Sequence, residues 1–130
     1  MKALTFPASR TAAAAAALVI AVCSAFAADS PFPIGTFAAE GQTLTLAFDD
    51  TGQFRVSEGE KLQVAGRYEV KAGQFEITDK QGPWACTKAD QQTGTYRWTY
   101  EHSVLTFSTV SDHCKDRVQS LTALKWKQKS

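Results

Sequence analysis

The chain has 130 residues, of which 14 are basic and 13 acidic, so its formal net charge is +1. Such a balance gives no basic surface of the kind that attracts nucleic acid, and we expect no nucleic-acid partner. The length accommodates one domain with a modest core and leaves no room for a second domain.

Residues 1–27 have the features of a signal peptide. Lys2 and Arg10 precede an apolar run over residues 12–22, and the Ala-Phe-Ala sequence that ends at Ala27 fits the pattern that signal peptidase recognises. The run is too short to span a membrane. Cleavage after Ala27 leaves 103 of the 130 residues, and we expect a secreted or periplasmic protein.

The three cysteines divide between the leader and the domain. Cys23 would be lipidated in a lipoprotein signal, but Val22 and Ile20 replace the small residue and the leucine that such signals usually have. Cys86 and Cys114 follow the leader, and export to an oxidising compartment predicts a disulfide between them. For their separation of 28 residues the loop-entropy model gives about 3.5 kcal/mol. Two free thiols or a metal-binding pair are the alternatives.

The first elements after the leader are an extended segment and a hairpin. Residues 28–33 contain two prolines, which cannot start a helix and predict an extended segment. Apolar and polar side chains alternate over residues 43–48 and 54–57, which predicts two strands. Residues 49–52 (Asp-Asp-Thr-Gly) form the turn between them. Asp50-Thr51-Gly52 also matches the core of aspartic proteases, but the chain is too short for that two-lobed enzyme, and we interpret the sequence as a hairpin tip.

The middle of the chain continues with period-2 alternation. Leu62 to Val70 alternate over nine residues, which predicts the clearest strand. Phe75 and Ile77 form the next strand, and residues 79–83 are rich in turn formers. A glycine, a spacer and an aromatic residue recur three times and are interpreted as strand starts. They are Gly35-Thr36-Phe37, Gly66-Arg67-Tyr68 and Gly94-Thr95-Tyr96.

The last third follows the same pattern. Strands are predicted over residues 96–100 and 105–107, followed by a polar loop over 111–116 and a final strand over 118–126. No amphipathic stretch has a period of 3.6, so we expect about eight strands and no helix. Evenly spaced hairpins favour an all-β, antiparallel up-and-down barrel over residues 34–130, with a Greek-key sandwich as the alternative.

Aromatic side chains on the inward face of these strands are the candidate ligand-binding residues, with Trp98 at their centre. They are Phe54, Tyr68, Tyr96, Trp98, Tyr100, Phe107 and Trp126. An eight-stranded barrel is either filled by side chains or holds one small ligand. Inward Tyr and Trp need hydrogen-bond partners, which favours a cavity with a few polar contacts.

Other candidate chemistry is sparse. Asp112, His113 and Asp116 could form part of a metal site. The alternative is a solvated loop in which Asp112 pairs with Arg117. No nucleophile, acid–base or zinc motif is present, so we expect a protein that is not an enzyme and needs no cofactor or metal.

The glycine-aromatic openings, residues 94–98 (Gly-Thr-Tyr-Arg-Trp) and residues 112–117 (Asp-His-Cys-Lys-Asp-Arg) with the late Trp126 resemble small exported bacterial lipocalin-like proteins. Gly35-Thr36-Phe37 is similar to the lipocalin Gly-x-Trp signature, with Phe37 in place of Trp. A lipocalin's middle-strand aspartate-tyrosine motif and C-terminal helix are not recognised, so the resemblance is to the wider calycin-like group. It implies an eight-stranded barrel that holds a small apolar molecule.

The sequence therefore predicts an exported, non-enzymatic barrel that binds a small, largely apolar ligand in its interior. The alternative is a protein-binding module, such as an inhibitor of a protease or lysozyme, which acts through its loops or through residues 28–33 as an N-terminal arm.

Overall fold

A computed structural model describes residues 31–130, which form eight strands and one helix. The signal peptide and most of the extended segment predicted over residues 28–33 lie outside the described residues. The elements are β1 (Gly35–Ala39), β2 (Leu44–Phe48), β3 (Gln53–Glu58), β4 (Lys61–Lys71), β5 (Gln74–Gln81), β6 (Thr93–Glu101), β7 (Val104–Ser111), α1 (Lys115–Thr122) and β8 (Trp126–Gln128).

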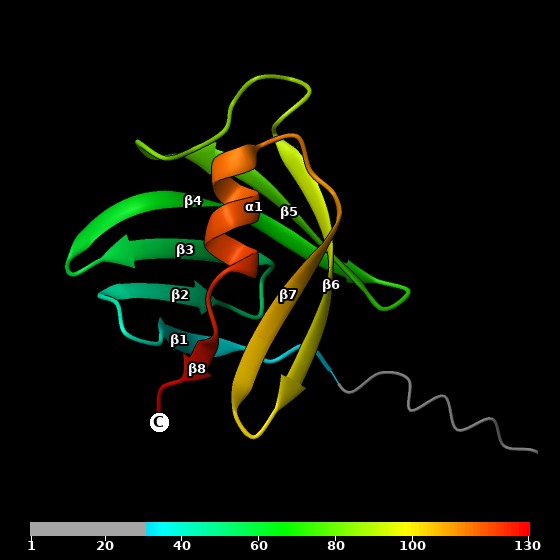
Figure 1. The fold of residues 1–130 in the computed structure, drawn as a ribbon. Coiled ribbons are helices and arrows are strands. Elements are labelled where there is room, and N and C mark those ends of the chain that lie inside the picture. Colours follow the sequence, from blue (N-terminus) through cyan, green and yellow to red (C-terminus); the bar gives the residue numbers. More distant parts are fainter. Residues whose placement is uncertain (1–30) are drawn as a thin grey trace, which may run out of the picture.

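The strands form a closed barrel in which each is antiparallel to its neighbours in the chain, and β8 closes it by pairing with β1 (Figure 1). This confirms the predicted up-and-down barrel. Because the strands alternate in direction, the turns alternate between two ends. The α1 end carries the β1–β2 and β3–β4 turns, the β5–β6 loop and α1. The Phe32 end, named for a residue that enters the barrel there, carries the other three turns, the first described residues and the C-terminus.

Alternating burial explains most of the strands. In β2 the side chains of Leu44, Leu46 and Phe48 are buried while those between them are half-exposed, as a strand with one face on a core requires. The turn from residue 49 to 52 is the predicted hairpin tip. There Asp49 Oδ1 accepts hydrogen bonds from the backbone N–H groups of Thr51 and Gln53, both at 2.9 Å.

The interpretation of Gly66 as a strand start is wrong. Gly66 lies in the middle of β4, where the register between β4 and β5 shifts. A Cβ at this position would lie 2.0 Å from Thr78 O and 2.9 Å from the ring of Phe54. Glycine is therefore needed here because β5 approaches β4 closely, and not because a strand begins.

The prediction of no helix, with a strand over residues 118–126, is also wrong. Residues 115–122 form α1, whose buried side chains are Arg117 and Leu121, one turn apart. The last strand is short and begins at Trp126. Figure 1 shows α1 next to the loop between β5 and β6, at one end of the barrel. No helix within residues 31–130 is long and apolar enough to cross a membrane.

Candidate functional site

The seven aromatic residues predicted to bind a ligand are divided between the two ends of the barrel. Phe54, Tyr96, Phe107 and Trp126 are buried, and Tyr68, Trp98 and Tyr100 are half-buried. All seven belong to the core or pack against it. They do not, however, line one common space.

Phe32 fills the Phe32 end of the barrel. Its ring stacks on Phe75 at a centroid distance of 5.1 Å and meets Phe48 and Trp98 edge to face at 4.9 and 5.1 Å. The rings of Tyr68 and Phe107 lie at 5.5 and 6.5 Å. Residues 31–33 are therefore fixed to the barrel by an aromatic cluster, and this end holds side chains where a ligand would lie.

The α1 end contains a cavity of about 600 Å³, within the range of small-molecule sites. Its lining combines the inner faces of β2 to β5, residues 83–86 of the β5–β6 loop, α1 and the start of β8. Phe54 and Trp126 are the two predicted ligand-binding residues that line it. The remaining apolar wall includes Leu44, Val56, Val64, Ile77, Leu121 and Leu124.

Trp84 also lines this cavity and is 44% exposed, which places its ring at the boundary with solvent. Its backbone N–H donates to Gln63 O at 2.9 Å, so the loop is fixed to β4. Cys86 follows two residues later and forms the predicted disulfide with Cys114, which joins this loop to the start of α1. Both segments that cover the cavity are thus held together covalently.

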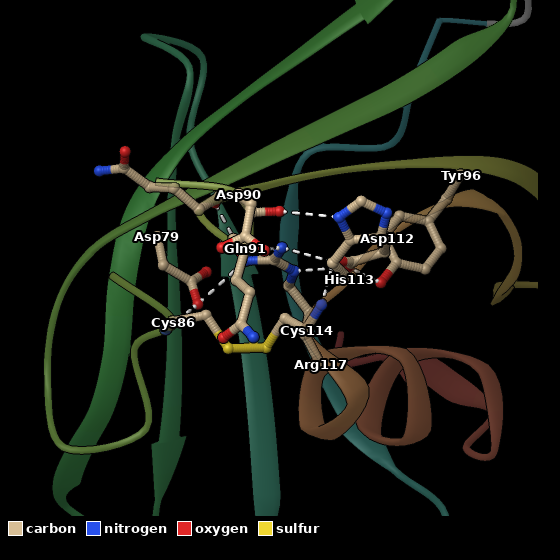
Figure 2. Close-up of a disulfide and its surroundings, with 10 residues drawn as sticks. Asp79, Cys86, Asp90, Gln91, Tyr96, Asp112, His113, Cys114 and Arg117 are labelled. Carbon is tan, nitrogen blue, oxygen red and sulfur yellow. Dashed lines mark hydrogen bonds and ion pairs between the residues drawn. A yellow bond between two sulfur atoms is a disulfide. The ribbon is translucent and has the colours of Figure 1, made fainter. Parts of the chain in front are cut away.

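Arg117, which lines the cavity, is the centre of the buried polar cluster drawn in Figure 2. Nε and Nη2 donate to the two oxygens of Asp112, both at 2.7 Å. Nη1 donates to Gln92 O and lies 3.1 Å from Asp79 Oδ2, and Nη2 also donates to Gln91 O. This guanidinium group thus makes four hydrogen bonds and forms ion pairs with two carboxylates.

Asp112 is equally well paired. Its Oδ1 accepts from the Cys114 backbone N–H at 2.8 Å, and its Oδ2 accepts from the hydroxyl of Tyr96. Burial alone would raise the pKa of Asp112, but the hydrogen bonds from Arg117 and Tyr96 outweigh it and lower that pKa. Burial and the nearby carboxylate of Asp112 raise the pKa of the Tyr96 phenol.

Asp79 is the exception in the cluster. It is 2% exposed, and its Oδ2 accepts from the Cys86 backbone N–H at 2.8 Å and forms an ion pair with Arg117. Its Oδ1 has no hydrogen-bond partner among the described residues, and Asp79 lines the cavity. Burial raises the pKa of the Asp79 carboxyl, against the lowering effect of the Cys86 N–H and Arg117.

The predicted metal residues are not brought together. Asp112 binds Arg117, Asp116 lies in the first turn of α1, and Nδ1 of His113 is 3.1 Å from Asp90 O. The pairing of Asp112 with Arg117 agrees with the alternative interpretation, although Arg117 is only 7% exposed and the pair is not solvated. Elsewhere in residues 31–130, Asp79, Cys86 and Cys114 bring ligand atoms within 4.8 Å, but the two sulfurs are joined in the disulfide.

Sequence reasoning missed Asp79 because it was assigned to a turn, whereas it lies in β5. A signal was present: Phe75, Ile77 and Asp79 occupy alternate positions, so the carboxylate continues an inward-facing series. A charged residue at an inward position of a barrel strand is costly to bury and therefore suggests a functional role.

Comparisons of the chain with protein-family models, with curated proteins and with solved structures found no match. The fold is compatible with the lipocalin-like resemblance, and the assignment of a function depends on the geometry of the cavity.

Proposed function

We propose that the protein is an exported lipocalin-like barrel that binds one small, largely apolar molecule in the cavity at the α1 end and catalyses no reaction. The observation that carries the proposal is the cavity itself, at about 600 Å³ with a mainly apolar and aromatic wall. Export is supported by the leader sequence and by the Cys86–Cys114 disulfide, which suits an oxidising compartment.

Ligand binding at this place has a direct optical signal, because Trp84 and Trp126 both line the cavity. A panel of fatty acids, isoprenoids and aromatic compounds should include members that change tryptophan fluorescence saturably. Ser120 lies on α1 and lines the cavity, so Ser120→Phe should fill the space and weaken that binding at least about tenfold. Ser108→Phe, at an exposed position of β7, is the matched control and should bind as the wild type does.

Failure of every compound in the panel to give a saturable change would contradict the proposal. Equal binding by the Ser120→Phe and wild-type proteins would also contradict it, because the ligand would then lie outside the cavity. Circular dichroism of each variant reports whether the β-sheet is retained, so that loss of binding is not confused with loss of folding.

A second candidate function is inhibition of an exported enzyme through the β5–β6 loop, favoured by one observation. Trp84 is 44% exposed on a loop that the disulfide fixes, and tryptophan is enriched among the residues that dominate protein interfaces. An N-terminal arm is less suitable, because Phe32 is inserted into the barrel. Against a panel of secreted proteases and lysozymes, Trp84→Ala should abolish inhibition and Ser120→Phe should preserve it. If the protein inhibits none of the enzymes in the panel, this second function is ruled out.

A further inference from the structure

The buried cluster around Arg117 leaves one polar atom without a partner. Arg117 makes four hydrogen bonds and an ion pair with Asp79 Oδ2, both oxygens of Asp112 are hydrogen-bonded, and Oδ2 of Asp79 accepts from the Cys86 N–H. Oδ1 of Asp79 alone is unpaired, and less than 1 Å² of its surface reaches solvent. An unsatisfied carboxylate oxygen in a buried position costs free energy, so a native structure is expected to supply a donor to it.

The charges in the cluster do not cancel either. When both are ionised, the carboxylates of Asp79 and Asp112 share one guanidinium group, which leaves one negative charge in excess in the cluster. Among the described residues that line the cavity, the ionised side chains are Asp79, Asp116 and Arg117, so the lining also carries an excess of one negative charge. The guanidinium group of Arg117 is already engaged by two carboxylates and two backbone carbonyls. The cavity therefore favours a positive group over a negative one.

The two features coincide at one residue. Asp79 contributes both the unpaired oxygen and the uncompensated charge, and it lies in the wall of a cavity that is otherwise mainly apolar. Since Oδ1 is almost fully covered, a ligand's donor reaches it only if a neighbouring lining side chain moves aside. Trp84 and Ala85, in the loop that covers this wall, are the nearest in sequence to Cys86, whose N–H holds the other oxygen.

We propose that the ligand of this cavity is an amphipathic primary amine, whose ammonium group donates a hydrogen bond to Asp79 Oδ1 while its apolar part lies against Phe54, Leu121 and Trp126. The inference rests on the proposed function and deepens it, because it names the chemical group that a small apolar ligand must carry. A hydrogen bond to a charged group contributes about 1.5 to 3 kcal/mol, which corresponds to a preference of about tenfold or more over an uncharged head group.

The test is a head-group series with a constant chain: octylamine, octanol, octanoate and octyltrimethylammonium, titrated calorimetrically into the wild-type protein at pH 7. Octylamine should bind at least about tenfold more tightly than each of the other three. The trimethylammonium compound keeps the charge but lacks an N–H donor, so it separates the hydrogen bond from simple attraction by charge.

Two variants locate the effect. Asp79→Asn keeps the shape of the side chain but removes the charge, and it should abolish the preference for octylamine while octanol still binds. Glu76→Gln removes an exposed carboxylate of the same strand that does not line the cavity, and should leave the preference within about twofold. Thermal unfolding of both variants verifies folding, and the wild-type series stands without them if Asp79→Asn fails to fold.

The outcomes separate this inference from the proposed function. If all four compounds bind with similar affinity, the cavity binds ligands but a water molecule satisfies Asp79, and the amine inference is overturned. Equal binding of octylamine and octyltrimethylammonium would overturn the hydrogen bond to Oδ1. Tighter binding of octanoate would mean that Asp79 is protonated and donates, which also overturns it. If none of the four binds, nor any compound of the wider panel, both proposals fail together.

Discussion

Gly94 and Tyr96 lie two positions apart on β6, and both lie next to the carboxylate of Asp112. Tyr96 donates its hydroxyl hydrogen to Asp112 Oδ2, and a Cβ at Gly94 would lie only 2.2 Å from that oxygen. The glycine-x-aromatic sequence that starts this strand is thus explained by contacts with the residue that holds Arg117. Gly35 and Gly66 meet other partners, so the three similar sequences have different physical causes.

Gly94→Ala is therefore expected to push Asp112 away from Arg117. The added methyl group has no space, and overpacking of this kind costs about 1 to 3 kcal/mol of unfolding free energy. Thr95→Ala, one position along on the half-exposed face, should change the free energy by less than about 0.5 kcal/mol. Urea denaturation of both variants measures the difference, and equal midpoints would contradict the close contact at Gly94.

The pH dependence of stability should carry opposite contributions from the two buried carboxylates. The pKa of Asp112 is lowered by folding, so its stabilising contribution is complete above its ordinary pKa and is lost as the pH falls through the lower folded value. The pKa of Asp79 is raised, so its destabilising contribution is present above the raised value and fades as the pH falls through that value toward its ordinary pKa.

Relative to the wild type, we therefore expect the unfolding free energy of Asp112→Asn to fall less, or rise more, from pH 5 to pH 2. We expect that of Asp79→Asn to fall more over the same range. Urea denaturation at a series of pH values measures all three slopes. The same slope in Asp112→Asn as in the wild type would show that folding does not shift the pKa of Asp112, which would contradict the effect of its pairing with Arg117.

At the scale of elements, period-2 alternation was sufficient to predict the barrel, because each strand has one face on the core and one toward solvent. The helix was not predictable in the same way. Only Arg117 and Leu121 are buried in α1, and eight residues cover little more than two turns, while Val118, Ser120 and Thr122 also fit an alternating strand. The three-dimensional context, including the disulfide and the carbonyls of Gln91 and Gln92, selects the helix.

The candidate site was predictable only in part. Pairing of Asp112 with Arg117 follows from their nearness in sequence, but its burial depends on a loop some 25 residues earlier. The split of the aromatic residues between the two ends depends on Phe32, which the sequence places in an extended segment without indicating where its ring goes. The sequence alone therefore does not show which end of the barrel is filled, because this depends on tertiary contacts.

The N-terminal segment is expected to stabilise the barrel through Phe32. Phe32→Ala removes a ring that contacts five other aromatic rings, and truncation of a packed phenylalanine should lower the unfolding free energy by about 2 to 4 kcal/mol. Ile34→Ala, at a position that is 48% exposed, is the matched control and should be within about 0.5 kcal/mol of the wild type. If the two variants unfold at the same denaturant concentration, Phe32 does not close this end.

The disulfide joins the two segments that cover the cavity, so its loss should affect both stability and binding. Cys86→Ser should lower the unfolding free energy by about 2 to 5 kcal/mol and weaken ligand binding. Denaturation of the wild type with and without a reductant provides the comparison. Identical midpoints, or two thiols that titrate in the native protein, would contradict a formed disulfide.

At the scale of the whole molecule, the barrel has one filled end and one end with a cavity. Its three tryptophans are distributed over both ends, so their signals can show at which end a ligand binds. Trp84 lies at the boundary of the cavity and Trp126 in its wall, while Trp98 packs against Phe32 at the opposite end. Each indole N–H gives a separate signal in a ¹H–¹⁵N correlation spectrum. Ligand position can thus be determined without a variant.

Titration of the ¹⁵N-labelled protein with octylamine is the most direct measurement. Binding in the cavity predicts saturable shifts of the Trp84 and Trp126 indole signals with one shared dissociation constant, while the Trp98 signal stays in place. A saturable shift of Trp98 alone would put the ligand at the Phe32 end. If no indole signal moves with octylamine or with any compound of the wider panel, the barrel does not hold a small molecule.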